Sequence, residues 1–230
     1  IFHRAAELVY KDLTANGKEI RKEDLDQVLR NDIKLQNYVD IAFKEEFFHV
    51  ALTEKPEYNG TQLINAKVIT SYLRQLLRND LQYAPFFMEG MEKKVTEIIE
   101  IETSQGKLAL NIGGTIDRID SKDDTLRIVD YKTGGSPKTP ENIKQLFTPA
   151  NGRPNYIFQT FLYASIMCRK QSLKVAPSLL YIHRAASETY SPVIEMGEAR
   201  QPKTPVNNFA FYEDEFRERL QTLLQEIYNP

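Results

Sequence analysis

The chain has little cysteine, no long apolar run and almost no net charge. Its single cysteine among 230 residues, Cys168, excludes an internal disulfide and a four-cysteine iron–sulfur or zinc site within the chain. No apolar run reaches the roughly 18 residues of a transmembrane helix, and no signal peptide is expected. The formal net charge of −2 gives no overall basic signature. We therefore expect a cytoplasmic protein that does not associate with membranes.

What is present is an ordinary globular composition, with 41% hydrophobic and 27% charged residues. Cys168 lies in the apolar segment FLYASIMC and is expected to be a buried thiol. The chain starts at Ile1 rather than at Met, so a piece of a longer protein is the expectation. Between residues 136 and 174 the charge is locally basic, with one acid, Glu141, against Lys138, Lys144, Arg153, Arg169, Lys170 and Lys174. Such a surface could meet phosphate; the alternative is a solvated loop and helix end.

The hydrophobic pattern changes near residue 85. Apolar residues at three- and four-residue spacing predict helices over 2–13, 23–33, 35–48 and 61–82, the last ending before Pro85. Alternation then predicts strands over 91–102, 107–120 and 125–133. A long loop over 136–155 is followed by a helix over 156–171, strands over 175–185 and 191–198, and a helix over 212–228. The fold class is α/β, with a central mixed sheet (a three-strand meander, a helix and a further strand) flanked by helices.

We expect one domain over 1–230, made of a mainly helical part (1–84), a core of sheet and helix (85–190) and a C-terminal strand and helix (191–230). Within the core, the stretch GGTIDRIDSKDDTLRIVDYKTG at 113–134 predicts a β-hairpin whose strands contain Asp117, Asp130 and Lys132. Such residues are normally disfavoured in strands. With a turn over 122–125, Asp117 faces Asp130, with Cβ atoms roughly 4.5–5.5 Å apart. Lys132 then shares their face, although a one-residue slip of the register would separate the two carboxylates.

Two opposed carboxylates repel each other unless a cation lies between them. A divalent cation removes that conflict, and oxygen ligands suit Mg²⁺ or Mn²⁺. Lys132 could orient an attacking water or neutralise charge that develops on phosphorus. On spacing alone, the alternative is a solvent-facing cluster of salt bridges.

Four sequence elements support the metal interpretation. They are G-x-x-D-R-x-D at 114–120, D-Y-K-T-G at 130–134, Q-x-x-x-Y at Gln159 and Tyr163, and a histidine, His3, in a helix before the sheet. Together they resemble the PD-(D/E)XK nuclease superfamily, and more closely its RecB-like branch, which includes the nuclease domains of RecB and AddB. The resemblance covers residues 1–185 and implies a restriction-endonuclease-like core behind an N-terminal helical region, so that 1–230 would be a single nuclease domain.

The resemblance also implies roles for individual residues. The catalytic residues would be Asp117, Asp130 and Lys132. The ligands of Mg²⁺ (or Mn²⁺) would be His3, Asp117, Asp130 and the backbone carbonyl of Tyr131. The substrate would be bound by Gln159 and Tyr163, together with the basic residues Lys138, Lys144 and Arg153. Arg118 and Asp120 are assigned to opposite faces, with Arg118 in a structural ion pair. AddB-type members often carry a four-cysteine iron–sulfur cluster, which this chain cannot form.

The implied function is a metal-dependent DNA nuclease, in particular an exonuclease acting on single-stranded ends. Its partner would be a helicase domain or subunit in DNA repair and recombination. The basic loop at 136–153 would guide the strand, with Phe147 or Tyr156 stacking on bases. Two alternatives stay open: a catalytically silent nuclease fold that binds DNA or docks a protein, and a nuclease of the CRISPR-adaptation type. A site-specific restriction enzyme is disfavoured, because the sequence shows no separate target-recognition module.

Overall fold

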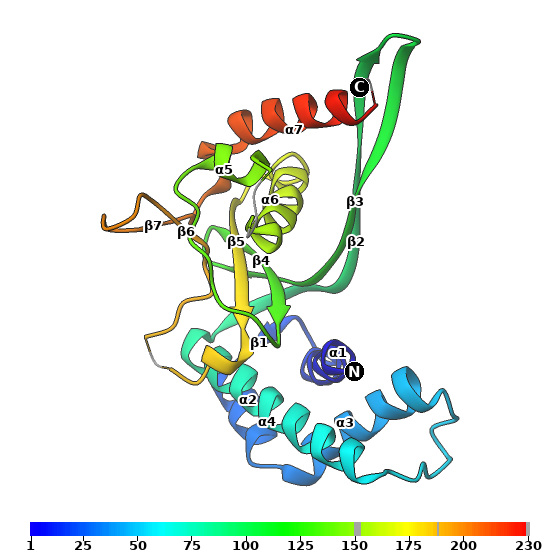
Figure 1. The fold of residues 1–230 in the computed structure, drawn as a ribbon. Coiled ribbons are helices and arrows are strands. Elements are labelled where there is room, and N and C mark those ends of the chain that lie inside the picture. Colours follow the sequence, from blue (N-terminus) through cyan, green and yellow to red (C-terminus); the bar gives the residue numbers. More distant parts are fainter. Residues whose placement is uncertain (150–152, 188, 229–230) are drawn as a thin grey trace. The chain divides into compact units, whose positions relative to one another are not determined.

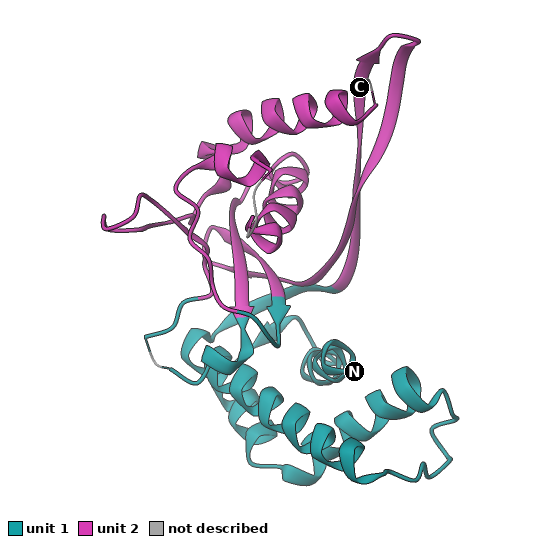
Figure 2. Cartoon of the chain, viewed as in Figure 1, with its two compact units in different colours: residues 1–91, 131–135, 181–191 teal, residues 92–130, 136–180, 192–230 magenta. Residues whose placement is uncertain are grey.

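The computed structural model describes residues 1–149, 153–187 and 189–228, which form two compact units (Figure 2). Unit 1 contains residues 1–91, 131–135 and 181–191. Unit 2 contains residues 92–130, 136–180 and 192–230. Part of the loop predicted over 136–155 lies outside the described residues, at 150–152.

Unit 1 is mainly helical (Figure 1). Its helices are α1 (Phe2–Leu13), α2 (Lys22–Leu29), α3 (Asp32–Phe43) and α4 (Gly60–Tyr83), and a π-helix at Lys44–Phe48 continues α3. The helices predicted over 2–13 and 61–82 are confirmed. The single helix predicted over 23–33 is wrong at its end, because Asn31 caps α3 instead by accepting a hydrogen bond from the Lys34 amide at 3.0 Å.

Apolar stripes hold the helices of unit 1 together. In α1 the buried residues recur every three or four positions, and α1 packs against α3 and α4. Helix α4 begins with a capping box between Asn59 and Gln62 and ends at Tyr83, with Ala84 as its C-cap residue before Pro85. In the described part of the chain, no helix combines the length and the apolar character that crossing a membrane requires.

A short strand interrupts the region that the sequence predicts to be entirely helical. Strand β1 (Glu19–Ile20) pairs antiparallel with the start of β2, Glu19 with Phe87 and Ile20 with Phe86. Ile20 and Phe86 are both buried. A strand of two residues shows no alternation, so the pattern could not reveal it.

The main sheet confirms the predicted fold class, a mixed sheet flanked by helices (Figure 1). Its order is β1-β2-β3-β4-β5, where β2 is Phe86–Thr103, β3 is Gly106–Lys122, β4 is Thr125–Lys132 and β5 is Lys174–Tyr181. The three predicted strands of the meander are therefore confirmed. The strand predicted over 175–185 is too long, because β5 ends at Tyr181 and a 3₁₀-helix follows at Ile182–Arg184.

The helices of unit 2 are α5 (Ile143–Phe147), α6 (Asn155–Cys168) and α7 (Glu213–Tyr228). Helix α6 lies against β3 and α7. The prediction of a loop over 136–155 is wrong at α5, where Asn142 accepts a hydrogen bond from the Gln145 amide at 3.1 Å and Ile143 and Leu146 are buried. Two apolar residues three apart anchor this single turn to the core.

Two further expectations for unit 2 are corrected. Within 191–198, Val193 forms an isolated antiparallel bridge with Ser178 of β5, whereas strand β6 (Glu195–Met196) pairs with β7 (Thr204–Pro205) in a separate two-stranded sheet. Cys168 is half-buried rather than buried, because it is the last residue of α6. Burial raises the pKa of its thiol to about 12, with a smaller contribution from Glu213.

Candidate active site

The hairpin of β3 and β4 has the register that its sequence predicts. The paired residues are Arg118 with Val129, Ile119 with Ile128, Asp120 with Arg127, Ser121 with Leu126 and Lys122 with Thr125. The tight turn between them uses a left-handed backbone at Asp123 (φ 53°), a conformation that Asp tolerates better than most residues. The predicted turn over 122–125 is therefore confirmed.

This register determines which side chains share a face. Continued by one pair beyond Arg118 and Val129, this register would set Asp117 opposite Asp130. Lys132 lies two residues beyond Asp130 in β4 and projects from the same face. Asp130 is buried, whereas Asp117 and Lys132 are partly exposed. Two acids and an amine are thus carried on one face of two neighbouring strands.

The opposite face holds a buried ion-pair network. Arg118 Nε donates to Asp120 at 2.7 Å, and Arg127 donates to both oxygens of Asp120 at 3.0 Å. Burial by itself would raise the pKa of the Asp120 carboxyl, but Arg127 and Arg118 outweigh it and hold that pKa below its ordinary value.

The network confirms the structural ion pair predicted for Arg118, but the assignment of Arg118 and Asp120 to opposite faces is wrong, because residues two apart in a strand share a face. Arg127 is a partner that the sequence reasoning missed. The register could have found it, since it places Arg127 opposite Asp120.

Helix α6 contributes the glutamine and tyrosine of the Q-x-x-x-Y element. Gln159 Nε2 donates to the hydroxyl of Tyr163 at 3.0 Å, as their four-residue spacing on one helix face requires. The Tyr163 ring lies directly over Gly114 of β3, where an added Cβ would overlap the hydroxyl oxygen and come within 3.1 Å of the ring. Gly114 is therefore needed for this close approach, and two of the sequence elements meet in the structure.

We predict that Gly114→Ala displaces Tyr163 and destabilises the protein by about 1–3 kcal/mol, the usual cost of overpacking. Urea unfolding of the variant measures this cost. Tyr163→Phe in the same chain removes the nearest overlapping atom and should recover part of the loss. A double variant no more stable than Gly114→Ala alone would contradict the assignment of the overlap to the hydroxyl.

His3, the predicted histidine ligand, lies at the start of α1. Its ring stacks on that of Tyr131, with centroids 6.0 Å apart and planes at 27°, and Phe2 meets the same ring edge-on at 5.8 Å. The first turn of α1 therefore lies beside the D-Y-K segment of β4. The Tyr131 side chain projects from the face opposite to Asp130 and Lys132, so metal ligation by His3 stays a prediction.

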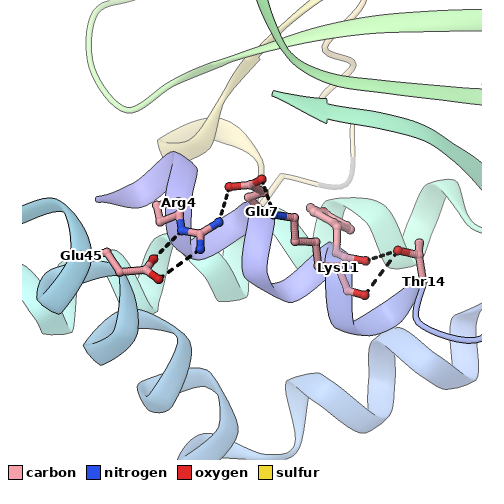
Figure 3. Close-up of polar contacts among 6 residues, drawn as sticks. Arg4, Glu7, Lys11, Thr14 and Glu45 are labelled. Atoms are coloured by element: carbon pink, nitrogen blue, oxygen red, sulfur yellow. Dashed lines mark hydrogen bonds and ion pairs between the residues drawn. The ribbon is translucent and has the colours of Figure 1, made fainter. Parts of the chain in front are cut away.

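The start of α1 is also held by charged contacts (Figure 3). Arg4 donates to both oxygens of Glu45, at 2.5 and 3.2 Å, and to Glu7 at 2.6 Å. Glu7 also pairs with Lys11 at 2.7 Å. Hydrogen bonding to Glu45, above all, raises the pKa of the Arg4 guanidinium further above its ordinary value. Through Glu45 these contacts connect the turn that carries His3 to the π-helix.

Three cations of the basic stretch at 136–174 form ion pairs or hydrogen bonds with residues of β2 or of the β3–β4 turn. Arg169 lies 3.2 Å from Glu97, and Lys174 lies 2.6 Å from Asp124. Lys170 Nζ donates to the Thr96 carbonyl at 2.9 Å. These three cations therefore have structural partners.

The basic residues predicted to bind substrate lie earlier in the stretch. Lys138 is exposed, Lys144 is exposed beside a groove of about 380 Å³ between α5 and α7, and Arg153 donates to Asn155 at 3.0 Å. Of the two aromatic residues proposed to stack on bases, Phe147 packs against Phe158 and Phe216 with ring centroids 5.2 and 5.3 Å away. Tyr156 is 49% exposed. Tyr156 is therefore the better placed of the two.

The donor chemistry of the hairpin suits a magnesium ion. Mg²⁺ typically takes one or two protein carboxylates and leaves its other positions to water and phosphate, and Asp117 and Asp130 supply two on one face. Within 1–149, 153–187 and 189–228, no group of three or more His, Cys, Asp or Glu side chains is arranged to hold a metal ion. His3, Asp117 and Asp130 are therefore not brought together as one such group, and the predicted ligand set stays a prediction.

A mixed sheet flanked by helices, with paired acids and a lysine on its central hairpin, defines a restriction-endonuclease-like nuclease fold. The family model of the PD-(D/E)XK nuclease superfamily matches residues 1–230, so the chain belongs to this superfamily. Its members are typically nucleases that use divalent metal ions such as Mg²⁺. A comparison with the curated proteins finds no match.

Proposed function

We propose that this nuclease-superfamily chain is a metal-dependent deoxyribonuclease of the RecB/AddB-like branch. The observation that supports it best is the hairpin register from Lys122–Thr125 to Arg118–Val129, which, continued by one pair, would bring Asp117 opposite Asp130 with Lys132 on the same face. The contact between Gly114 and Tyr163 adds support, because it joins the G-x-x-D and Q-x-x-x-Y elements of that branch. We propose that residues 1–230 act as one nuclease domain.

In this proposal Asp117 and Asp130 hold Mg²⁺ or Mn²⁺, with the Tyr131 carbonyl and His3 completing the ligand set. A bound divalent ion would stabilise the charge on the phosphoryl oxygens and on the leaving 3′-oxygen. Lys132 would hold the attacking water by a hydrogen bond, or neutralise charge on a non-bridging oxygen. Hydrolysis breaks the bond between phosphorus and the 3′-oxygen.

Substrate positioning is proposed for unit 2. Gln159 and Tyr163 would hold the nucleic-acid strand, and Lys138, Lys144 and Arg153 would contact its phosphates. The preferred substrate would be a single-stranded DNA end cleaved by an exonuclease. A helicase domain or subunit in DNA repair and recombination is the proposed partner, and the cytoplasm is the proposed location.

The proposal is tested by incubating the chain with labelled single- and double-stranded DNA in Mg²⁺, Mn²⁺ or EDTA, beside Lys132→Ala. We expect cleavage with metal, none with EDTA, and a loss of at least about 100-fold in the variant, since one charge-stabilising group is removed. Binding without cleavage in either metal would contradict the enzyme and favour the silent binding module.

Tyr156→Ala is predicted to weaken the binding of single-stranded DNA by about 1–3 kcal/mol, the usual contribution of one stacked base. Fluorescence anisotropy at fixed salt measures the change in Kd. Phe147→Leu is the matched control, because the Phe147 ring packs edge-on against Phe158 and Phe216 and is less exposed than Tyr156. Equal effects of the two substitutions would argue against stacking on Tyr156.

A further inference from the structure

The Glu97 carboxylate of strand β2 interacts with two arginines, one at the end of α6 and one in α7. Glu97 Oε1 lies 3.2 Å from Arg169 Nε, just past the end of α6, and Glu97 Oε2 accepts a hydrogen bond from Arg217 of α7 at 3.0 Å. One residue earlier, the Thr96 carbonyl accepts a hydrogen bond from Lys170 at 2.9 Å. The Glu97 side chain is only 16% exposed. We call these five residues the Glu97 cluster.

The Glu97 cluster lies on β2 next to a close approach of β3. At Gly113 an added Cβ would overlap the Val95 carbonyl and come within 2.8 Å of the Thr96 Cα. The adjacent Gly114 supports the Tyr163 ring. The ion pairs of Glu97 on β2, the two glycines Gly113 and Gly114 on β3, and Tyr163 of α6 therefore lie in the same part of the two strands.

The Glu97 cluster holds one end of helix α6. The N-cap residue of this helix, Pro154, makes no side-chain cap hydrogen bond, whereas Arg169 and Lys170 attach its other end to Glu97 and Thr96. The apolar contacts of α6, such as Phe161 on Phe209 at 4.9 Å, are not directional and permit small shifts. Charge-assisted hydrogen bonds set a defined distance and orientation.

We propose that Glu97 is a positioning residue: through Arg169 and Arg217 it sets α6 against β3, so that Gln159 and Tyr163 keep a fixed position over Gly114. Its catalytic consequence rests on the proposed function, since Gln159 and Tyr163 are the residues that would hold the substrate strand. Glu97 itself does not touch the substrate in this proposal.

Hydrogen exchange tests whether Glu97 positions helix α6. Glu97→Gln keeps the shape of the side chain and removes its charge, and we expect the amides of residues 159–163 to exchange about 10-fold faster, since a charge-assisted contact is lost. Arg219→Gln is the matched control, because Arg219 pairs within α7 with Glu215 at 2.8 Å. Unchanged exchange at 159–163 in Glu97→Gln would overturn the proposal. Arg217→Gln, which removes one of the two arginine partners, serves if Glu97→Gln folds poorly.

A double-mutant cycle measured by DNA cleavage tests whether Glu97 affects catalysis through Tyr163. We expect Glu97→Gln to raise KM about 10-fold with little change in kcat, because α6 holds the strand rather than the reacting groups. Combined with Tyr163→Phe, the two effects should be clearly less than additive. Full additivity would show that Glu97 does not act through Tyr163 and would overturn its positioning role. If the unaltered protein cleaves no DNA, the proposed function fails, whereas the exchange experiment still decides the role of Glu97.

Discussion

Asp117→Asn is expected to lower the rate of DNA cleavage by at least about 1,000-fold without lowering the melting temperature, because a metal carboxylate is lost while a like-charge contact is relieved. Asp117 and Asp130 directly follow the last observed pair of the hairpin, Arg118 with Val129, and would be opposed if the register continues by one pair. Asparagine keeps the shape and cannot supply the second negative charge. Active sites that place like charges close together usually lower the stability of the fold, and substitutions that remove one charge often raise it.

Single-turnover cleavage and thermal unfolding of the same preparation test this prediction together. Asp130→Asn should behave in the same way, since it removes the opposite member of the pair. Asp124→Asn is the control, because Asp124 lies in the turn of the same hairpin and pairs with Lys174 at the surface. Cleavage by Asp117→Asn within about 10-fold of the unaltered protein would be too fast for the loss of a metal carboxylate.

Asp120→Asn, three residues further along β3, is expected to lower the stability of the fold and to leave the cleavage activity unchanged. Asp120 is fully buried and accepts hydrogen bonds from Arg118 and Arg127. Removing its charge takes a carboxylate partner from two buried guanidinium groups, which costs about 3–5 kcal/mol. Urea unfolding at neutral pH measures the loss, and activity per folded molecule should be retained.

The pH dependence of stability gives an independent test of the Asp120 network. The pKa of Asp120 is lower in the folded chain than its ordinary value, so its charged form stabilises the fold above an unfolded-state pKa of about 3.9. This contribution is lost as the pH falls through the lower, folded-state pKa. Asp120→Asn should therefore flatten the decline in stability at acid pH. A decline as steep as that of the unaltered chain would mean that other carboxyls cause it.

Much of the fold could be predicted because its signals are local. The repeat of apolar residues in 2–13 and 61–82 specifies α1 and α4, and the alternation and turn residues of 113–134 specify the hairpin of β3 and β4 and its register. The predictions failed where a segment is too short to show a period. Strand β1 and helix α5 are examples, and both are stabilised by burial of Ile20, Ile143 and Leu146 in cores built from distant segments.

The sequence by itself determined that Asp117, Asp130 and Lys132 share a face, because side-chain alternation along paired strands follows from the turn alone. Only the tertiary structure decided that Tyr163 rests on Gly114, that His3 stacks on Tyr131 and that Glu97 joins β2 to α6 and α7. Each of these contacts joins residues dozens of positions apart. Such contacts depend on how whole elements pack, and no periodicity within one segment encodes that packing.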